Sequence, residues 1–126
     1  MKFSSTQVKG KGRGKLLGFP TINLNIPDDF KLIEGIYAVK VFIEGQEFLG
    51  ALHFGPIPTF KEEGETLEVF LIDVNPENLP ETSGLDIEIE IIKYLRAVQN
   101  FPDQDSLAKQ IGEDVLETKK LQGQAV

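Results

Sequence analysis

Apolar side chains recur at every second position in several short stretches of this chain, and that spacing limits the fold more than any other feature. In the stretch 35–43, the residues Tyr37, Val39, Val41 and Ile43 fall on one face, as in a strand with one face in a core. Six strands are predicted, over residues 3–8, 21–26, 35–43, 47–54, 66–73 and 85–95. Short strands at hairpin spacing, without helices between them, predict a mainly all-β fold, an antiparallel barrel rather than a parallel βαβ sheet.

Only the end of the chain has the period of a helix. Leu107, Ile111 and Val115 recur every four residues and form one apolar stripe. Asp103 is placed to cap the first turn, and Asp105 is placed to interact favourably with the helix dipole. We predict a helix over about residues 104–120, following a barrel over about residues 1–98. The stripe is expected to cover the open side of the sheet.

Composition limits the class of protein. With 126 residues, the chain is predicted to form a single domain, 1–126, with a modest core. The absence of cysteine excludes disulfides and thiolate metal sites. No apolar run approaches the length of a membrane span, and the first twenty residues lack the apolar core of a signal peptide. A cytoplasmic protein without membrane association is therefore predicted.

Charge is distributed unevenly along the chain. The formal net charge of −7 argues against nucleic-acid binding. Residues 1–21 nevertheless contain no acidic residue and several basic ones: Lys2, Lys9, Lys11, Arg13 and Lys15. This basic segment suits a small polyanion such as a nucleotide; the alternative is an accidental asymmetry of the surface.

The glycine-rich stretch 10–15 is a candidate phosphate-binding loop. Gly10, Gly12 and Gly14 alternate with Lys11, Arg13 and Lys15. Closely spaced glycines let a backbone fold tightly and expose its amide N–H groups, and the neighbouring cations add positive charge. Neither the Walker A spacing nor the G-x-G-x-x-G spacing is present. From these residues alone, a flexible and solvated hairpin is an equally good interpretation.

Two strands carry polar residues suited to chemistry. In the strand 21–26, Thr21 and Asn23 share one face, and their hydroxyl and amide oxygens are hard, neutral ligands suited to Mg²⁺. The apolar Ile22, Leu24 and Ile26 are predicted on its other face. In the strand 66–73, Glu68 has apolar neighbours on both faces. A partly desolvated carboxylate is a candidate general base; the alternative is an edge strand on which Glu68 reaches water.

These residues belong to a longer ordered set. The loop runs into Gly18-Phe19-Pro20-Thr21-Ile22-Asn23, and the set continues with Gly35-Ile36-Tyr37-Ala38-Val39, Gly55 with Pro58-Thr59-Phe60, Leu67-Glu68-Val69, Leu95-Arg96, Phe101, and Gln110-Ile111 with Asp114. In order and spacing, the chain resembles the riboflavin kinase (flavokinase) domain over nearly its whole length. That domain occurs in stand-alone riboflavin kinases and as the C-terminal domain of bifunctional riboflavin kinase/FAD synthetases. The resemblance implies a six-stranded Greek-key β-barrel with a C-terminal α-helix.

The resemblance also implies an activity and its residues. The reaction would transfer the γ-phosphoryl group of ATP to the terminal ribityl hydroxyl of riboflavin, giving FMN and ADP. Glu68 falls on the position of the catalytic base, and Thr21 and Asn23 fall on the positions that carry Mg²⁺, which arrives with ATP. The implied nucleotide-binding residues are Gly12, Arg13, Gly14, Lys15, Pro20 and Thr21. The implied flavin-binding residues are Arg96, Phe101, Leu107 and Ile111.

Other interpretations stay open from the sequence. Arg96 is alternatively a solvated cation at a strand end, and Phe101, Leu107 and Ile111 are alternatively core residues. His53, the only histidine, is expected to be structural. The chain could be a flavin- or nucleotide-binding module that has lost turnover, or a barrel that binds another protein, but the set Thr21, Asn23 and Glu68 favours the kinase. The expected partners are riboflavin and ATP, with fusion to or association with an FAD synthetase domain.

Overall fold

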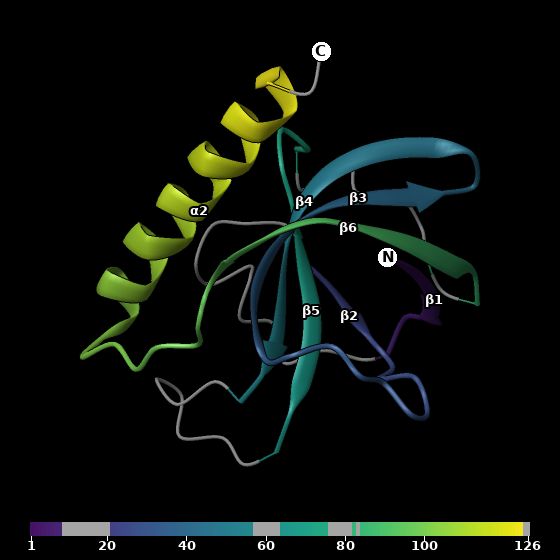
Figure 1. Ribbon diagram of the computed structural model, residues 1–126, viewed down its shortest axis with the longest axis horizontal. Coiled ribbons are helices and arrows are strands. Elements are labelled where there is room, and N and C mark those ends of the chain that lie inside the picture. Colours follow the sequence, from purple (N-terminus) through teal and green to yellow (C-terminus); the bar gives the residue numbers. More distant parts are fainter. Residues whose placement is uncertain (9–20, 57–63, 76–81, 83, 125–126) are drawn as a thin grey trace.

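The computed structural model describes residues 1–8, 21–56, 64–75, 82 and 84–124 (Figure 1). Its elements are β1 (Lys2–Thr6), β2 (Thr21–Leu24), β3 (Gly35–Ile43), β4 (Gln46–Gly55), β5 (Thr66–Leu71), β6 (Asp86–Arg96) and α2 (Gln104–Gln124). The six strands form one sheet in the order β1-β6-β3-β4-β5-β2, and every pair of neighbours is antiparallel. β6 returns beside β3 after the meander β3-β4-β5, which is the Greek-key order. The predicted architecture is therefore confirmed.

The two ends of the sheet meet. Gln7 forms an isolated bridge with Leu24, so the segment after β1 pairs with β2, the strand at the opposite end of the sheet. The backbone N–H of Val8 donates to the Asn23 carbonyl at 2.8 Å, and the N–H of Asn25 donates to the Thr6 carbonyl at 2.9 Å. These bonds close the barrel and pair the edges of β1 and β2 at this point, which removes the exposed edges of an open sheet.

The barrel interior contains one continuous apolar cluster. It is formed by alternate residues of five strands: Ile22, Leu24, Tyr37, Val39, Val41, Ile43, Leu52, Phe54, Leu67, Val69, Leu71, Ile87 and Ile89. The predicted inward face of residues 35–43 is confirmed, because Tyr37, Val39, Val41 and Ile43 all belong to this cluster. A two-residue turn, Glu44-Gly45, with positive φ at both positions connects β3 to β4. Ile26 was expected on the inward face and is 38% exposed, because β2 ends at Leu24 and the alternation stops there.

A second, smaller buried layer lies outside the barrel, between the sheet and α2. Helix α2 runs along one side of the barrel (Figure 1) and packs against β4 and β3. The sheet presents the small residues Ala38 and Ala51 there, both at most 2% exposed, and small residues allow a helix to approach a sheet closely. The predicted stripe of α2 was partly wrong: Ile111 is buried, but Leu107 and Val115 are only half-buried, and Asp114 and Thr118 complete the buried face.

Helix α2 begins at the predicted position and ends later than predicted. The Asp103 carboxylate accepts a 2.8 Å hydrogen bond from the Ser106 backbone N–H, which confirms the cap and lowers the pKa of Asp103. Asp105 lies in the first turn, as predicted. The helix continues past residue 120 to Gln124, since no glycine or proline interrupts the chain between residues 113 and 122. Lys119 also anchors this part of α2 to Asp73 at 2.8 Å.

Candidate active site

The strand register places five residues in one row across the outer face of the sheet. Asn23 on β2 pairs with Glu68 on β5, and Glu68 pairs with His53 on β4. His53 pairs with Ile36 on β3, and Ile36 pairs with Arg96 on β6. Register partners project from the same face of a sheet. The row therefore contains the predicted base and one predicted metal ligand side by side, with one predicted flavin residue at its far end.

Glu68 lies next to both predicted metal ligands. It stands directly opposite Asn23, and Thr21 stands opposite Phe70, two residues along β5. Directly opposite Cβ atoms in an antiparallel pair are about 4.5–5.5 Å apart, and the diagonal neighbour is about 7–8 Å away. The three polar side chains thus emerge from one patch of two adjacent strands.

Glu68 is buried. Only 3% of the residue is exposed, and β5 lies between β2 and β4 in the sheet. The alternative in which Glu68 sits on an edge strand and reaches water is therefore wrong. Burying a carboxylate is costly unless polar groups surround it, so the polar residues Asn23 and His53 on its two sides fit its position.

The described residues on either side of the glycine-rich segment lie at this patch. Val8 precedes that segment and donates its backbone N–H to the carbonyl of Asn23 at 2.8 Å. Thr21, which follows the segment, is the first residue of β2. The predicted nucleotide-binding residues Gly12, Arg13, Gly14, Lys15 and Pro20 lie outside the described part of the chain. The two described residues that flank residues 9–20, Val8 and Thr21, therefore both lie close to Asn23.

The donor set at the patch fits a hard divalent cation carried by an anionic ligand. Thr21 and Asn23 are half-buried and offer a hydroxyl and an amide oxygen, which suit Mg²⁺ and carry no charge. Among the residues that the structure describes, no three His, Cys, Asp or Glu side chains cluster as a metal site. A cation at this patch would therefore draw its counter-charge from its ligand, as Mg²⁺ bound to a triphosphate does.

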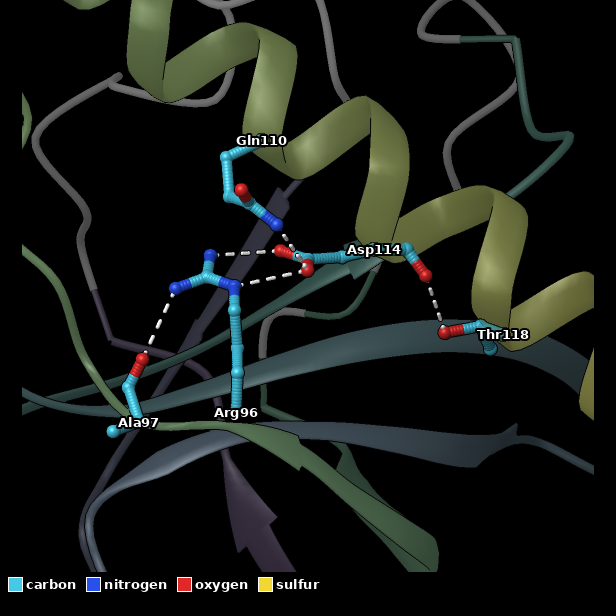
Figure 2. A network of polar contacts seen from close by, with 5 residues as sticks. All are labelled: Arg96, Ala97, Gln110, Asp114 and Thr118. Carbon is cyan, nitrogen blue, oxygen red and sulfur yellow. Dashed lines mark hydrogen bonds and ion pairs between the residues drawn. The ribbon is translucent and has the colours of Figure 1, made fainter.

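The far end of the row forms a separate polar junction between β6 and α2 (Figure 2). Arg96 Nε donates to Asp114 Oδ1 at 3.0 Å, and its Nη2 donates to Asp114 Oδ2 at 2.8 Å. Gln110 Nε2 donates to the same Oδ1 at 3.2 Å, and the Thr118 hydroxyl donates to the Asp114 carbonyl at 2.8 Å. The bidentate geometry fixes both position and orientation of the guanidinium, so this junction joins the helix to the barrel.

Arg96 is not a solvated strand-end cation. Its side chain is only 16% exposed and that of Asp114 only 4%, so that alternative is wrong. Its Nη1 donates to the carbonyl of Ala97 at 3.1 Å, and its guanidinium lies over the Phe101 ring, 5.8 Å from the ring centroid. Three of the five guanidinium N–H groups are used in these bonds, which leaves one on each terminal nitrogen for another acceptor.

The backbone also determines where Arg96 sits. A Cβ atom added at Gly35 would lie 2.5 Å from Cε2 of Tyr94 and 2.9 Å from the carbonyl oxygen of Arg96. Glycine at this position therefore allows β6 to pass close to the start of β3. The register between these strands shifts just after Ile36, and this irregularity leaves Arg96 on the same outer face as Ile36.

The predicted flavin residues are only partly brought together. Arg96 and Phe101 are in contact, and Ile111 is buried on α2 at 4% exposure, one turn from Asp114. Leu107 is half-buried in the first part of α2. Arg96 is three strands from Glu68 along the row, or roughly 14 Å at the usual spacing between strands. The two halves of the predicted site therefore share a face without touching through these residues.

Two residues at the site were missed by sequence reasoning. Asp114 follows Ile111 by three residues, so helical spacing already puts it on the predicted stripe. An acidic residue on a buried stripe needs a cationic partner, and that signal could have identified the pair with Arg96. His53 was expected to be structural, and its place beside Glu68 depends on a register that periodicity does not give.

One cavity lies apart from these groups. It encloses about 400 Å³ and is lined by Lys93, Glu113, Leu116, Glu117, Lys120 and Leu121. These residues belong to β6 and to the outward side of α2, and no predicted site residue is among them. The cavity therefore does not define the candidate active site. No helix among the described residues has the length and apolar character needed to cross a membrane.

Known proteins resemble this chain in both sequence and fold. A bifunctional riboflavin kinase/FMN adenylyltransferase of Buchnera aphidicola is 32% identical over 120 residues, which cover 93% of this chain and 37% of that protein. An RNA-binding riboflavin kinase of Bacillus subtilis is 36% identical over 113 residues, 89% of this chain and 47% of the relative. This chain thus spans less than half the length of these curated relatives.

Solved structures agree with this relation. A structure described as a macrolide-efflux protein from Streptococcus pneumoniae superimposes with a TM-score of 0.78, at 27% identity, over 94% of this chain and 38% of that one. Riboflavin kinase from Trypanosoma brucei superimposes with a TM-score of 0.61, at 20% identity, over 95% of this chain and 78% of the kinase chain, which supports the shared fold. The sequence profile of the riboflavin kinase family matches residues 1–122. This chain therefore belongs to the riboflavin kinase family.

Proposed function

We propose that this chain transfers the γ-phosphoryl group of ATP to the terminal ribityl hydroxyl of riboflavin, giving FMN and ADP. The observation that supports this proposal most directly is the register of β2 and β5. It puts the buried carboxylate of Glu68 opposite Asn23 and diagonal to Thr21. A general base and the ligands of a nucleotide-bound cation must meet at one point for phosphoryl transfer, because that reaction depends mostly on positioning and charge stabilisation.

The residues of the patch would each have a different role in the reaction. Glu68 would accept the proton of the ribityl hydroxyl. The oxygen of that hydroxyl forms a bond to the γ-phosphorus, and the bond between the γ-phosphorus and the leaving oxygen of ADP breaks. Thr21 and Asn23 would hold Mg²⁺, and Gly12, Arg13, Gly14, Lys15 and Pro20 would bind the nucleotide phosphates together with Thr21. When bound, Mg²⁺ would neutralise charge on the phosphate oxygens. The burial of Glu68 would keep bulk water from competing for the phosphoryl group.

The junction at the far end of the row is the proposed flavin side. The Arg96 guanidinium keeps two N–H groups for an acceptor on the flavin edge, and it rests over the Phe101 ring. Leu107 and Ile111 on α2 would add apolar surface for the flat ring system. The roughly three strand spacings between Arg96 and Glu68 are compatible with a substrate whose ring and reacting hydroxyl lie at opposite ends of a ribityl chain.

We further propose small-molecule partners and a cytoplasmic location. The matched relative from Buchnera is named as both a kinase and an adenylyltransferase, which supports fusion to or association with an FAD synthetase domain here. The Bacillus relative is named as RNA-binding. For this chain, the net charge of −7 supports the absence of nucleic-acid binding, since an acidic surface repels phosphate backbones.

Mass spectrometry of the reaction product tests the function. The protein is incubated with riboflavin, ATP and Mg²⁺, and the expected result is riboflavin heavier by one phosphoryl group, with an equal amount of ADP. Unchanged riboflavin would contradict the proposal. In that case, saturable flavin binding without ATP consumption would identify a binding module, and absence of ligand binding would favour a protein-interaction barrel.

A further inference from the structure

The side of α2 that faces away from the barrel presents an apolar residue among charges. The helix packs against β4 and β3, and its other side points away from the sheet (Figure 1). Leu116 lies on that outward side and is 59% exposed. Glu113, Glu117 and Lys120, within four residues of Leu116, are exposed as well. Exposed apolar side chains within a charged surface are typical of surfaces that bind another protein.

The same surface continues from α2 onto β6 through the cavity described above. That cavity encloses about 400 Å³ and is lined by Lys93, Glu113, Leu116, Glu117, Lys120 and Leu121. Its two leucines supply apolar area, and its four charged residues carry both signs equally. Lys93 is exposed on β6 and adds a positive charge on the side of the cavity opposite the helix. The outward surface therefore has no single sign of charge that would select a strongly acidic or strongly basic partner.

The charges on the outward side of α2 are instead complementary to themselves. Glu113 comes three residues before Leu116, and Lys120 comes four residues after it, so the three side chains lie along one line on the helix. If a second copy of α2 is laid antiparallel across Leu116, each Glu113 stands opposite Lys120 of the other copy. A parallel arrangement would place like charges opposite each other. The antiparallel arrangement is the one that a two-fold axis produces.

Glu113 and Lys120 are not used to hold this chain together. Among the described residues, neither of them takes part in an ion pair within the chain. Other charged residues of α2 do: Asp114 pairs with Arg96, and Lys119 pairs with Asp73. A partner could therefore pair with Glu113 and Lys120 without breaking a contact that stabilises the fold.

We propose that the outward side of α2 binds the same surface of a second copy of this chain in a two-fold symmetric, antiparallel dimer. Leu116 packs against Leu116 of the second copy at the axis, and two Glu113–Lys120 ion pairs flank this contact. Lys93 offsets the negative charge of the two Glu117 side chains, which approach each other near the axis. Each copy offers one exposed leucine and a few charges, so the interface belongs to the small class, below about 1,200 Å², and association is weak.

Sedimentation velocity at increasing protein concentration tests the dimer. The wild type should show a reversible monomer–dimer equilibrium below about 1 mM, the weak limit of specific association. Glu113→Lys places lysine side chains opposite each other at both ion pairs and should raise the Kd about tenfold, since two weak attractions become repulsions. Leu116→Ala should also raise the Kd. Glu47→Lys makes the same change in net charge at an exposed position of β4 and should keep the wild-type Kd.

Charge exchange tests the antiparallel pairing itself. Lys120→Glu alone should weaken association as Glu113→Lys does. The double variant Glu113→Lys/Lys120→Glu restores opposite charges at both positions and should return the Kd to within about threefold of the wild-type value. An equimolar mixture of the two single variants should form a heterodimer, although neither variant associates well by itself.

The inference is independent of the proposed kinase function, because neither Glu113 nor Lys120 has a part in that reaction. A wild type that stays monomeric up to about 1 mM would overturn the dimer. A dimer whose Kd is unchanged by Glu113→Lys, or is not recovered in the double variant, would overturn the assignment of this surface. Formation of FMN is measured separately, and its absence would leave the association result standing.

Discussion

The inner and outer faces of β2 and β5 carry different kinds of side chain, and on β5 both faces are buried. The inner face contributes Ile22, Leu24, Leu67, Val69 and Leu71 to the barrel core. The outer face carries Thr21, Asn23, Glu68 and Phe70, and Glu68 and Phe70 are still at most 7% exposed. Most antiparallel sheets bury one face and solvate the other, so this second covered face needs an explanation.

The two faces therefore divide two roles, stability on the inner face and chemistry on the outer face. The inner face closes the barrel around apolar side chains, whose burial is the main favourable term in folding. The outer face can therefore hold polar groups away from water without opening the core. If this division is correct, substitutions on the outer row should change chemistry more than stability, and substitutions on the inner face should do the reverse.

The largest effect is expected for Glu68→Gln on the outer face. Removing a general base typically costs about 10²–10⁴ in rate, while the isosteric amide should keep the fold and the binding of Mg·ATP. FMN formation and nucleotide binding are measured separately. Glu88→Gln, at a half-exposed position of β6, is the matched control and should keep full turnover. Wild-type turnover in the Glu68 variant would remove that residue from the mechanism.

An inner-face truncation should give the opposite result. Leu52 is fully buried in the barrel core, and Leu52→Ala should lower the free energy of unfolding by about 2–5 kcal/mol. Turnover per folded molecule should stay unchanged. Chemical denaturation measures the first quantity and kinetics at low temperature the second. Leu116→Ala is the control, since Leu116 is 59% exposed on α2 and its truncation should change stability by less than about 0.5 kcal/mol.

Breaking the junction between α2 and β6 tests what holds the helix against the outer face of β3 and β4. Asp114→Asn should destabilise the protein by roughly 3 kcal/mol, the lower end of the range for breaking a buried pair, because the Arg96 side chain keeps 16% exposure. Asp73→Asn removes the ion pair between Asp73 and Lys119 of α2, in which Asp73 is 75% exposed, and should cost at most about 1 kcal/mol. Equal effects in denaturation experiments would show that burial of the Arg96 pair is not what secures the helix.

The smallest effect concerns the start of α2 and depends on pH. The Ser106 backbone N–H lowers the pKa of the Asp103 carboxyl, so the ionised cap stabilises the folded state above the ordinary pKa of aspartate, about 3.9. That stabilisation is lost as the pH falls through the lowered folded-state pKa. Asp103→Ala should remove it at all pH values, whereas Asp103→Asn should keep a cap but lose its pH dependence. Thermal midpoints of the wild type and both variants are measured between pH 2 and pH 7. A midpoint that depends on pH in Asp103→Asn as it does in the wild type would contradict this explanation.

Periodicity and turn residues predicted the positions of the strands well, but they did not predict the order of the strands in the sheet. The period of two in residues 35–43 and the turn at Glu44-Gly45 specify β3, its inward face and its pairing with β4. The pairs β3–β6 and β2–β5 join segments that are far apart in sequence. Neither periodicity nor turn chemistry specifies such pairs, because they depend on the packing of the whole barrel. The Greek-key order was predicted only through the family resemblance.

The same limit explains which site residues were found. Thr21, Asn23 and Glu68 stand out because polar residues interrupt apolar strands. His53 also interrupts a strand, but its neighbour could not be predicted without the register of β4 against β5. Asp114 was within reach of sequence reasoning through its helical spacing. Its partner Arg96 was predicted to bind flavin, and the structure adds that most of its hydrogen-bonding capacity is used by the protein itself.

Paramagnetic NMR tests most directly whether Thr21, Asn23 and Glu68 form one metal–nucleotide site. Mn²⁺ accepts the same oxygen ligands as Mg²⁺, and when added with ATP it broadens the signals of nearby amides. The account predicts the strongest broadening at Thr21, Asn23 and Glu68, with the amide of Glu88 on β6 unaffected. Broadening centred elsewhere, with the Glu68 amide unchanged, would contradict the claim that the outer face of β2 and β5 is the reaction site.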